Sequence, residues 1–233
     1  MKVPILLPNI FDHPFTYDSG KIDLKVGDYV LIPFGKLKIT GVVWNEFESE
    51  NKKNFLIKKV ISKLNIPPLN EKTIDFLNWF SRYNVVPKGM ALKLLLLSSE
   101  AVENIDDKEF DIFFKKSKRK KFTLTEEQNR ALKNLNSDNN KFRVHVLQGI
   151  TGSGKTIVYF KAIKKIIDKG SQALIMLPEI GLTGQFEKKF KEFFGFNAAI
   201  WHSGITKKNK KIIWNGISTE KIKVIIGARS SLF

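Results

Sequence analysis

Residues 148–160, which read QGITGSGKTIVYF, restrict the possible folds of this chain more than any other stretch. Gly149, Gly154, Lys155 and Thr156 match the pattern G-x-x-x-x-G-K-[ST]. Glycines let successive backbone N–H groups turn toward phosphate oxygens, and the N-terminus of a following helix adds a positive dipole. A β-branched segment precedes the stretch and a helical pattern follows it, as the pattern requires. The sequence therefore predicts a strand, a phosphate-binding loop and a helix in succession.

The second half of the chain alternates between strand-like and helical stretches. The strand-like stretches are FRVHVL (142–147), QALIML (172–177), NAAIW (197–201) and KVIIG (223–227). The helical patterns run from the loop to about Lys169, from 183 to 194, and around 207–216. This spacing is typical of βαβ units and predicts a parallel sheet of four strands.

The first half has a different character. Residues 27–44, GDYVLIPFGKLKITGVVW, are β-branched and aromatic runs around a turn, which predicts a small antiparallel sheet or barrel. From Glu71 the apolar residues recur at helical spacing, and a second helix is expected after Pro87. MALKLLLL at 90–97 is too short to span a bilayer, which favours a buried helix. The expected fold class is α/β, with a β-rich domain preceding an incomplete parallel α/β lobe.

Charge marks the expected boundary between the two halves. The run KKSKRKK at 115–121 has six positive residues of seven, so the division is placed at 1–98, a basic linker at 99–121, and 122–233. Forty Lys plus Arg against 23 Asp plus Glu give a net charge of +17. This charge favours a polyanion such as nucleic acid as partner, although a lysine-rich surface also serves solubility.

Composition excludes several classes of protein. The chain has no cysteine, which excludes a disulfide framework, and three scattered histidines do not build a zinc site. Pro4 and Pro8 interrupt the apolar N-terminus and no small-residue cleavage site follows it, so a cytoplasmic protein without membrane contact is expected.

The chemistry of the phosphate loop assigns roles to its residues. Lys155 is expected to reach the β- and γ-phosphates of ATP, and the Thr156 hydroxyl to ligate Mg²⁺. The loop alone leaves open whether the chain is a kinase, a GTPase, a transporter or a helicase. Upstream, Thr125 is a candidate N-cap, and the amide of Gln128 is suited to pair with an adenine edge. A glutamine on a helix surface is the alternative interpretation.

Several stretches occur in an order that resembles superfamily 2 helicases, and together they resemble the PriA-type primosomal helicases, the family of primosomal protein N-prime. These stretches are TLTEEQNRAL, QGITGSGKTIVYF, ALIMLPEIGLTGQF, WHSGI and VIIGARSSLF. Four further stretches resemble the family's N-terminal domain, which binds the 3' end of a DNA strand. They are HPFTYDSG, VGDYVLIPFGK, GVVW and YNVVPKGMALKLLL. The resemblance covers nearly the whole chain and implies a RecA-like fold for the second half.

The resemblance also implies roles for individual residues of the second half. It implies an adenine contact for Gln128 and contacts to phosphate and Mg²⁺ for the loop residues, which are Gly149, Gly152, Ser153, Gly154, Lys155 and Thr156. It implies contacts to single-stranded DNA for Thr183, Gln185, Arg229 and Ser230. The chain departs from the family at Gly184, where proline is usual, and at Ala228, where threonine is usual.

In the N-terminal domain, the resemblance places Phe15 and Tyr17 in an aromatic loop that surrounds the terminal nucleotide by stacking. The alternative is that these aromatic residues close a small β-barrel. Family members often have aspartate between the two aromatic residues, where this chain has Thr16. Threonine is a weaker partner for a 3' hydroxyl.

The resemblance implies the N-terminal part of an ATP-dependent 3' to 5' DNA helicase, which binds stalled or abandoned forks and restarts replication by primosome assembly. Single-stranded and forked DNA, primosome proteins and the replicative helicase loader are the implied partners. The family's acidic magnesium motif, its catalytic arginine and its eight zinc-binding cysteines are expected only beyond this sequence, and a winged-helix domain does not fit between 97 and 122. We therefore expect weak ATP binding without turnover. A stand-alone DNA-binding module with a relic phosphate loop is the alternative.

Overall fold

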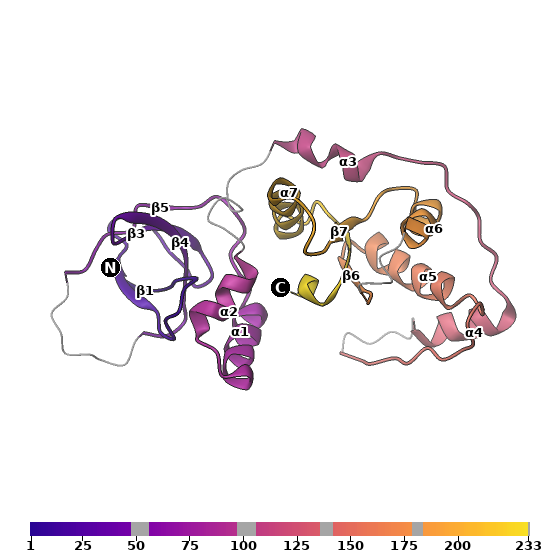
Figure 1. Cartoon of the computed structure of the whole chain (residues 1–233), viewed down its shortest axis with the longest axis horizontal. Coiled ribbons are helices and arrows are strands. Elements are labelled where there is room, and N and C mark those ends of the chain that lie inside the picture. Colours follow the sequence, from indigo (N-terminus) through magenta and orange to yellow (C-terminus); the bar gives the residue numbers. More distant parts are fainter. Residues whose placement is uncertain (48–55, 97–105, 136–141, 179–183, 233) are drawn as a thin grey trace. The chain divides into compact units, whose positions relative to one another are not determined.

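The computed structural model describes residues 1–47, 56–96, 106–135, 142–178 and 184–232 (Figure 1). The chain forms two compact units, one built from Met1–Ile105 with Lys207–Thr219 and the other from Asp106–Thr206 with Glu220–Leu232. In the part of the chain that is described, every helix is too short or too polar to cross a bilayer.

The first unit contains a five-stranded antiparallel sheet. Its strands are β1 (Lys2–Leu6), β2 (Phe15–Asp18), β3 (Tyr29–Phe34), β4 (Leu37–Val43) and β5 (Ser62–Lys63), in the order β2-β1-β4-β3-β5. The β3–β4 hairpin turns at Gly35, whose φ of 61° favours glycine. The curved sheet (Figure 1) encloses a core of β-branched side chains that includes Ile5, Val30 and Ile32. The antiparallel sheet expected for residues 27–44 is therefore confirmed.

Two helices follow the sheet in this unit. Helix α1 (Glu71–Asn84) begins at Asn70, whose side chain accepts a hydrogen bond from the Thr73 N–H at 2.8 Å. Helix α2 (Lys88–Leu95) carries the apolar stretch expected to be buried, and its Ala91 and Leu92 are fully buried. Both helices pack their apolar sides into a shared core that includes Leu6, Val42, Trp44, Ile74 and Leu77.

Helix α7 (Lys207–Ser218) belongs to the same unit, although it follows the second strand of the other unit along the chain. The Trp214 ring is buried in the shared core and meets the Tyr29 ring edge-on, with 5.9 Å between centroids. Its Nε1–H donates to the Leu95 carbonyl at 3.1 Å. Trp214 thus satisfies its one polar group while its ring fills the core.

The second unit has a parallel sheet of three strands. They are β6 (Ala173–Met176), β7 (Ala199–Trp201) and β8 (Val224–Gly227), with β8 in the middle. Helices α4 (Glu126–Leu135), α5 (Lys155–Asp168) and α6 (Gly184–Phe194) belong to this unit. Phe160 of α5 is fully buried and meets four phenylalanine rings of α6, at positions 186, 190, 193 and 194. The α/β class with a parallel sheet is confirmed.

The strand expected at residues 142–147 does not form. Phe142, Val144 and Val146 are at least 77% exposed, and the segment pairs with none of the described strands. A period-2 pattern indicates a strand, but a strand forms only where a neighbour accepts its backbone hydrogen bonds. The sheet therefore has three described strands and not the four expected, and among these strands β6 and β7 each keep one unpaired side.

The basic run at 115–121 lies against helix α6. Before it come a 3₁₀ turn (Asp107–Phe110) and the short helix α3 (Asp111–Phe114). The Ser117 N–H donates to the Gly195 carbonyl and the Lys120 N–H to the Glu192 carbonyl, both at 2.8 Å. Lys120 also forms an ion pair with Glu192 at 2.8 Å. Backbone hydrogen bonds therefore hold the basic run against the end of α6. The domain limits at 98 and 121 stay a prediction.

Candidate functional site

The phosphate loop has the backbone that its glycines predict. Gly152 and Gly154 have φ values of 86° and 80°, in the left-handed region that side chains disfavour. Gly154 is the N-cap of α5, and a Cβ there would lie 2.4 Å from the Gln128 amide nitrogen. Gly149 is also confined, because its Cβ would lie 2.9 Å from the Ser153 hydroxyl oxygen. Any side chain at position 154 would therefore strain the loop in two ways.

Lys155 lies at the start of α5, and its ammonium group is bound by the loop itself. The Lys155 Nζ donates to the Gly149 carbonyl at 2.5 Å and to the Ile150 carbonyl at 2.8 Å. Both acceptors are neutral oxygens on the same loop that would hold phosphate. Because a charged phosphate oxygen is the stronger acceptor for an ammonium, an anion entering the loop would replace these carbonyls.

Gln128 joins helix α4 to the phosphate loop. Its Oε1 accepts from the Thr125 N–H at 3.0 Å, while the Thr125 hydroxyl accepts from the Gln128 N–H at 3.3 Å. This reciprocal pair is a capping box and confirms Thr125 as the N-cap. The Gln128 Nε2 donates to the Ser153 carbonyl at 2.9 Å. The glutamine side chain therefore caps its own helix and tethers the loop.

We predict that two substitutions of Gln128 separate these two roles. Gln128→Glu keeps an acceptor for the Thr125 N–H but has no donor for Ser153, whereas Gln128→Ala loses both contacts. Loss of the bond from the Thr125 N–H, one of the two bonds of the capping box, should lower the unfolding free energy by about 0.5 to 1.5 kcal/mol in the alanine variant only. Both variants should bind ATP more weakly, because both release the loop. Thermal unfolding and ATP titration of the two variants test this, and equal ATP affinity in glutamate variant and parent would contradict the tether.

Thr156 is engaged within α5. Burial raises the pKa of the Tyr159 hydroxyl, and a hydrogen bond with Thr156 partly opposes this shift. A hydrogen bond that lowers this pKa stabilises the phenolate, so the Thr156 hydroxyl is the donor and its oxygen lone pairs stay available to a metal ion. Within the described residues, no group of three or more His, Cys, Asp or Glu side chains is placed to hold a metal ion.

The predicted DNA-contacting residues of the second unit lie at one edge of the parallel sheet. Gln185 is exposed in the first turn of α6, after the end of β6. Arg229 is exposed in a 3₁₀ turn (Arg229–Leu232) directly after β8, which also contains Ser230. Because parallel strands end at the same edge, these residues share the edge where α5 begins at the phosphate loop. Thr183 lies outside the described residues.

In the first unit, the region predicted to bind the 3' end of DNA contains a cluster of aromatic side chains. The rings of Phe11 and Phe34 meet the Phe15 ring edge-on, with centroids 5.1 and 5.6 Å away, and His13 lies 4.9 Å from Phe15. Tyr17 is 5% exposed, and its hydroxyl donates to the Pro33 carbonyl at 3.1 Å. Its ring therefore belongs to the barrel core, where it is not available for stacking in this structure.

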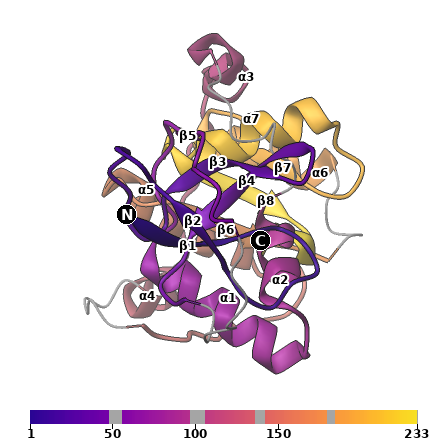
Figure 2. The same ribbon diagram turned by 90° about the vertical axis from the view of Figure 1, so that its left-hand side faces the viewer.

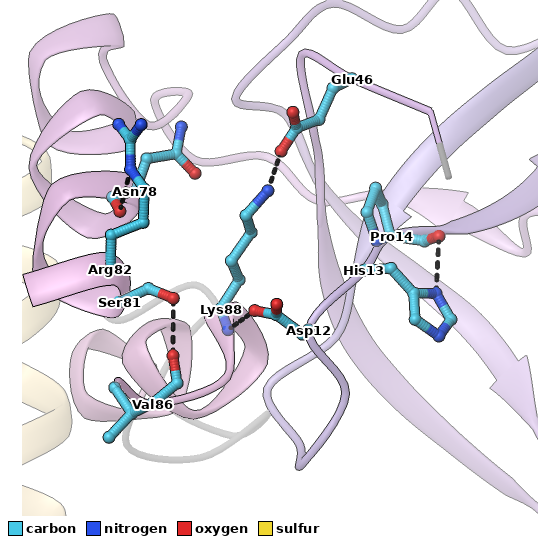
Figure 3. A network of polar contacts seen from close by, with 9 residues as sticks. All are labelled: Asp12, His13, Pro14, Glu46, Asn78, Ser81, Arg82, Val86 and Lys88. Carbon is cyan, nitrogen blue, oxygen red and sulfur yellow. Dashed lines mark hydrogen bonds and ion pairs between the residues drawn. The ribbon is translucent and has the colours of Figure 1, made fainter. Parts of the chain in front are cut away.

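The loop that carries Phe11 and His13 is anchored to the start of α2 (Figure 3). The Lys88 N–H donates to the Asp12 carboxylate at 2.8 Å, and the Gly89 N–H donates to the Phe11 carbonyl at 3.0 Å. The Lys88 ammonium forms an ion pair with Glu46. The Asp12 carboxylate thus lies at the N-terminus of α2, the positive end of the helix dipole, where a negative charge is favoured.

The contact between this loop and α2 leaves no room for a side chain at position 89. A Cβ on Gly89 would lie 2.5 Å from the carbonyl oxygens of Leu7 and Asn9, and 2.8 Å from that of Phe11. Sequence reasoning did not single out Asp12 or Gly89. A glycine within a helical pattern was the only available signal, because it often marks a close backbone approach.

Two family models match the chain. Residues 2–96 match the 3'DNA-binding domain (3'BD) of PriA, and residues 121–233 match the model described as Type III restriction enzyme, res subunit. A strand-end DNA-binding domain followed by a phosphate-loop α/β domain of helicase type defines the class of the chain.

Curated relatives narrow this class to one family. The chain is 37% identical over 233 residues to the replication restart protein PriA of Rickettsia conorii, covering 98% of this chain and 34% of that protein. Identity to PriA of Rickettsia typhi is 40% over 234 residues, with the same coverage. Identity to PriA of Bacillus subtilis is 36% over 140 residues, which cover 59% of this chain and 17% of that protein. The chain belongs to the PriA family of replication restart proteins, matches their N-terminal portion, and spans about a third of the length of the Rickettsia relatives.

Proposed function

We propose that this chain is the DNA-end-reading and nucleotide-binding part of an ATP-dependent 3' to 5' DNA helicase that restarts replication at stalled or abandoned forks. The observation that carries the proposal is the succession, in one chain, of a strand-end binding domain and a phosphate-loop domain of helicase type. The primosome proteins and the replicative helicase loader are the partners that this function requires.

In the second unit, we assign nucleotide binding to the phosphate loop. The backbone N–H groups of residues 149–156 would hold the phosphates, and Lys155 would exchange its two carbonyl partners for phosphate oxygens. The Thr156 hydroxyl oxygen would ligate Mg²⁺. The Gln128 amide would bond the adenine edge while its helix stays capped through the Thr125 hydroxyl. Gln185, Arg229 and Ser230 would contact the single strand at the same edge of the sheet, and Thr183 stays a predicted contact.

In the first unit, we assign the strand end to the aromatic cluster of Phe11, Phe15 and Phe34, and not to Thr16, because Thr16 lies on the opposite face of β2 from Phe15. Phe15 has the base-stacking role that the resemblance implies. Phe11 replaces Tyr17 as the second stacking ring, because the Tyr17 ring is buried. Stacking of a base on such rings tolerates any sequence, which suits a protein that must recognise fork ends of every sequence.

A steady-state phosphate-release assay with single-stranded DNA tests the nucleotide part of this proposal. We expect the chain to bind ATP without turning it over, because none of the described residues is assigned to stabilise the transition state, a role in which an arginine contributes about 10³ to 10⁵ in rate in comparable enzymes. Lys155→Ala exposes any contaminating ATPase. DNA-stimulated turnover above about 1 per second that disappears in this variant would contradict the expectation, since about 1 to 100 per second is the range typical of kinases with complete sites.

A further inference from the structure

A pocket of about 440 Å³ lies on the second unit, outside the residues assigned to nucleotide or DNA above. Four of its lining residues are lysines from one helix and the residue after it: Lys161, Lys164, Lys165 and Lys169. The apolar part of the lining, called the pocket floor below, consists of Leu132 of α4 and Phe193 of α6. Asp168 is the one acidic residue of the lining and forms an ion pair with Lys164 at 2.5 Å. The lining therefore has a clear excess of positive charge.

The pocket and the phosphate loop are well separated along α5. Lys165 follows Lys155 by ten residues of continuous helix, a distance of about 15 Å at 1.5 Å per residue. The loop lies at the edge where the parallel strands end, and the last turns of α5 return the chain to the start of β6. The lysines thus lie toward the opposite edge from Gln185 and Arg229.

The helix dipole accounts for only part of this arrangement. Cations are favoured in the last turn of a helix, which suits Lys165 and Lys169. Lys161 lies in the middle of α5, is half-buried, and has no carboxylate partner among the described residues. A lysine held over an apolar floor without a carboxylate is placed to meet an anion from outside the chain.

The basic run continues this surface. The Phe122 ring packs against Phe193 with 5.7 Å between centroids, which places the end of the run beside the pocket floor. Arg119 and Lys121 are exposed, and the Arg119 side chain lies over Gly195 at the end of α6. Positive charge therefore extends from α5 to the segment along α6.

We infer that this surface, the pocket lysines with Arg119 and Lys121, binds the phosphate backbone of a DNA duplex. Its chemistry favours a duplex over a single strand, because single-strand sites stack bases on exposed rings, whereas Phe193 is 8% exposed. A duplex offers phosphates without exposed bases, and lysines bind them without regard to sequence. The inference rests on the proposed function and deepens it, because forked DNA has duplex arms to which no residues are assigned above.

The test compares salt dependence in two double variants of the chain. Lys161→Gln/Lys165→Gln removes two pocket charges, and Lys207→Gln/Lys210→Gln removes two charges from α7 as the matched control. The ligand is a blunt duplex of about 20 base pairs with 3'-phosphates, which weakens binding at the strand-end site equally in both variants. The slope of log K against log salt should become shallower by about 1.8 in the pocket variant, at 0.9 per lost phosphate contact. Lys161→Arg/Lys165→Arg should restore it.

Three outcomes would overturn the inference. One is a slope in the pocket variant equal to that of the α7 control. Another is an equal loss for a single strand of the same length, which would place these lysines on the single-strand path. The last is competition at the pocket by a glutamate-rich peptide together with an unchanged duplex slope, which would assign the surface to an acidic protein segment. Because the ligand lacks a 3' hydroxyl and no ATP is present, a negative result leaves the proposed function standing.

Discussion

ATP affinity should fall by at least about tenfold when Lys155 is replaced by alanine. A hydrogen bond from a charged donor contributes about 1.5 to 3 kcal/mol net, which corresponds to about 10- to 150-fold in the dissociation constant. In the nucleotide-free structure the same ammonium holds the Gly149 and Ile150 carbonyls, so the substitution also removes the contacts that fix the loop before binding. Calorimetric titration with ATP and Mg²⁺ measures the effect.

Lys161→Ala is the matched control for this substitution. It removes the same charge from the same helix, but six residues further along, where no loop carbonyl is bound. If both variants lose ATP affinity equally, the effect belongs to net charge and the phosphate loop has no special role. Thermal unfolding of both variants separates loss of binding from loss of structure.

Gly89→Ala should destabilise the first unit by about 1 to 3 kcal/mol, the usual cost of forcing an extra carbon into a packed region. Alanine is favoured over glycine in a helix by about 1 kcal/mol, so propensity alone predicts the opposite sign. The added Cβ would meet three backbone carbonyls of the 7–11 segment, which do not yield as a flexible side chain does. We also expect weaker binding of DNA ends, because the loop that carries Phe11 must move.

Gly184→Ala provides the comparison for position 89. Gly184 also begins a helix, but nothing lies within 4 Å of the place where its Cβ would be. This variant should be as stable as the parent or slightly more stable in urea unfolding. Equal stability of Gly89→Ala and the parent would show that the loop is not clamped to α2.

Much of the second unit was predictable from local pattern. Glycines at 152 and 154 predicted the positive φ values of the loop, and the apolar period predicted α5 and α6 to within one or two residues. The strands at 173–176 and 224–227 also lie within the predicted ranges. These elements depend on neighbours close in sequence, which a pattern can represent.

The differences concern contacts between residues that are distant in sequence. Residues 142–147 have the pattern of a strand, but a strand also needs backbone hydrogen bonds to a neighbour distant in sequence, and this segment pairs with none of the described strands. Trp214 of α7 packs against Tyr29 and Leu95, and no local pattern indicates that partner. Asp12 and the Lys88 N–H are 76 residues apart in sequence, so no local pattern indicates their contact either.

The burial of Tyr17 could have been predicted from the sequence. Alternate residues of a strand share a face, so Phe15 and Tyr17 point to the same side of β2, toward the barrel core. The residue between them, Thr16, lies on the other face. A strand prediction for 15–18 would therefore have shown that both aromatic residues cannot surround a ligand on the far side of Thr16.

The central claim, that the first unit reads DNA strand ends, is tested most directly by a fluorescence titration with two DNA ligands. Both carry a duplex-adjacent strand of the same sequence, one ending in a 3' hydroxyl and the other in a 3'-phosphate. We predict about threefold to tenfold tighter binding of the hydroxyl end, the range that one neutral hydrogen bond supplies. Equal affinity for the two ends would contradict the claim.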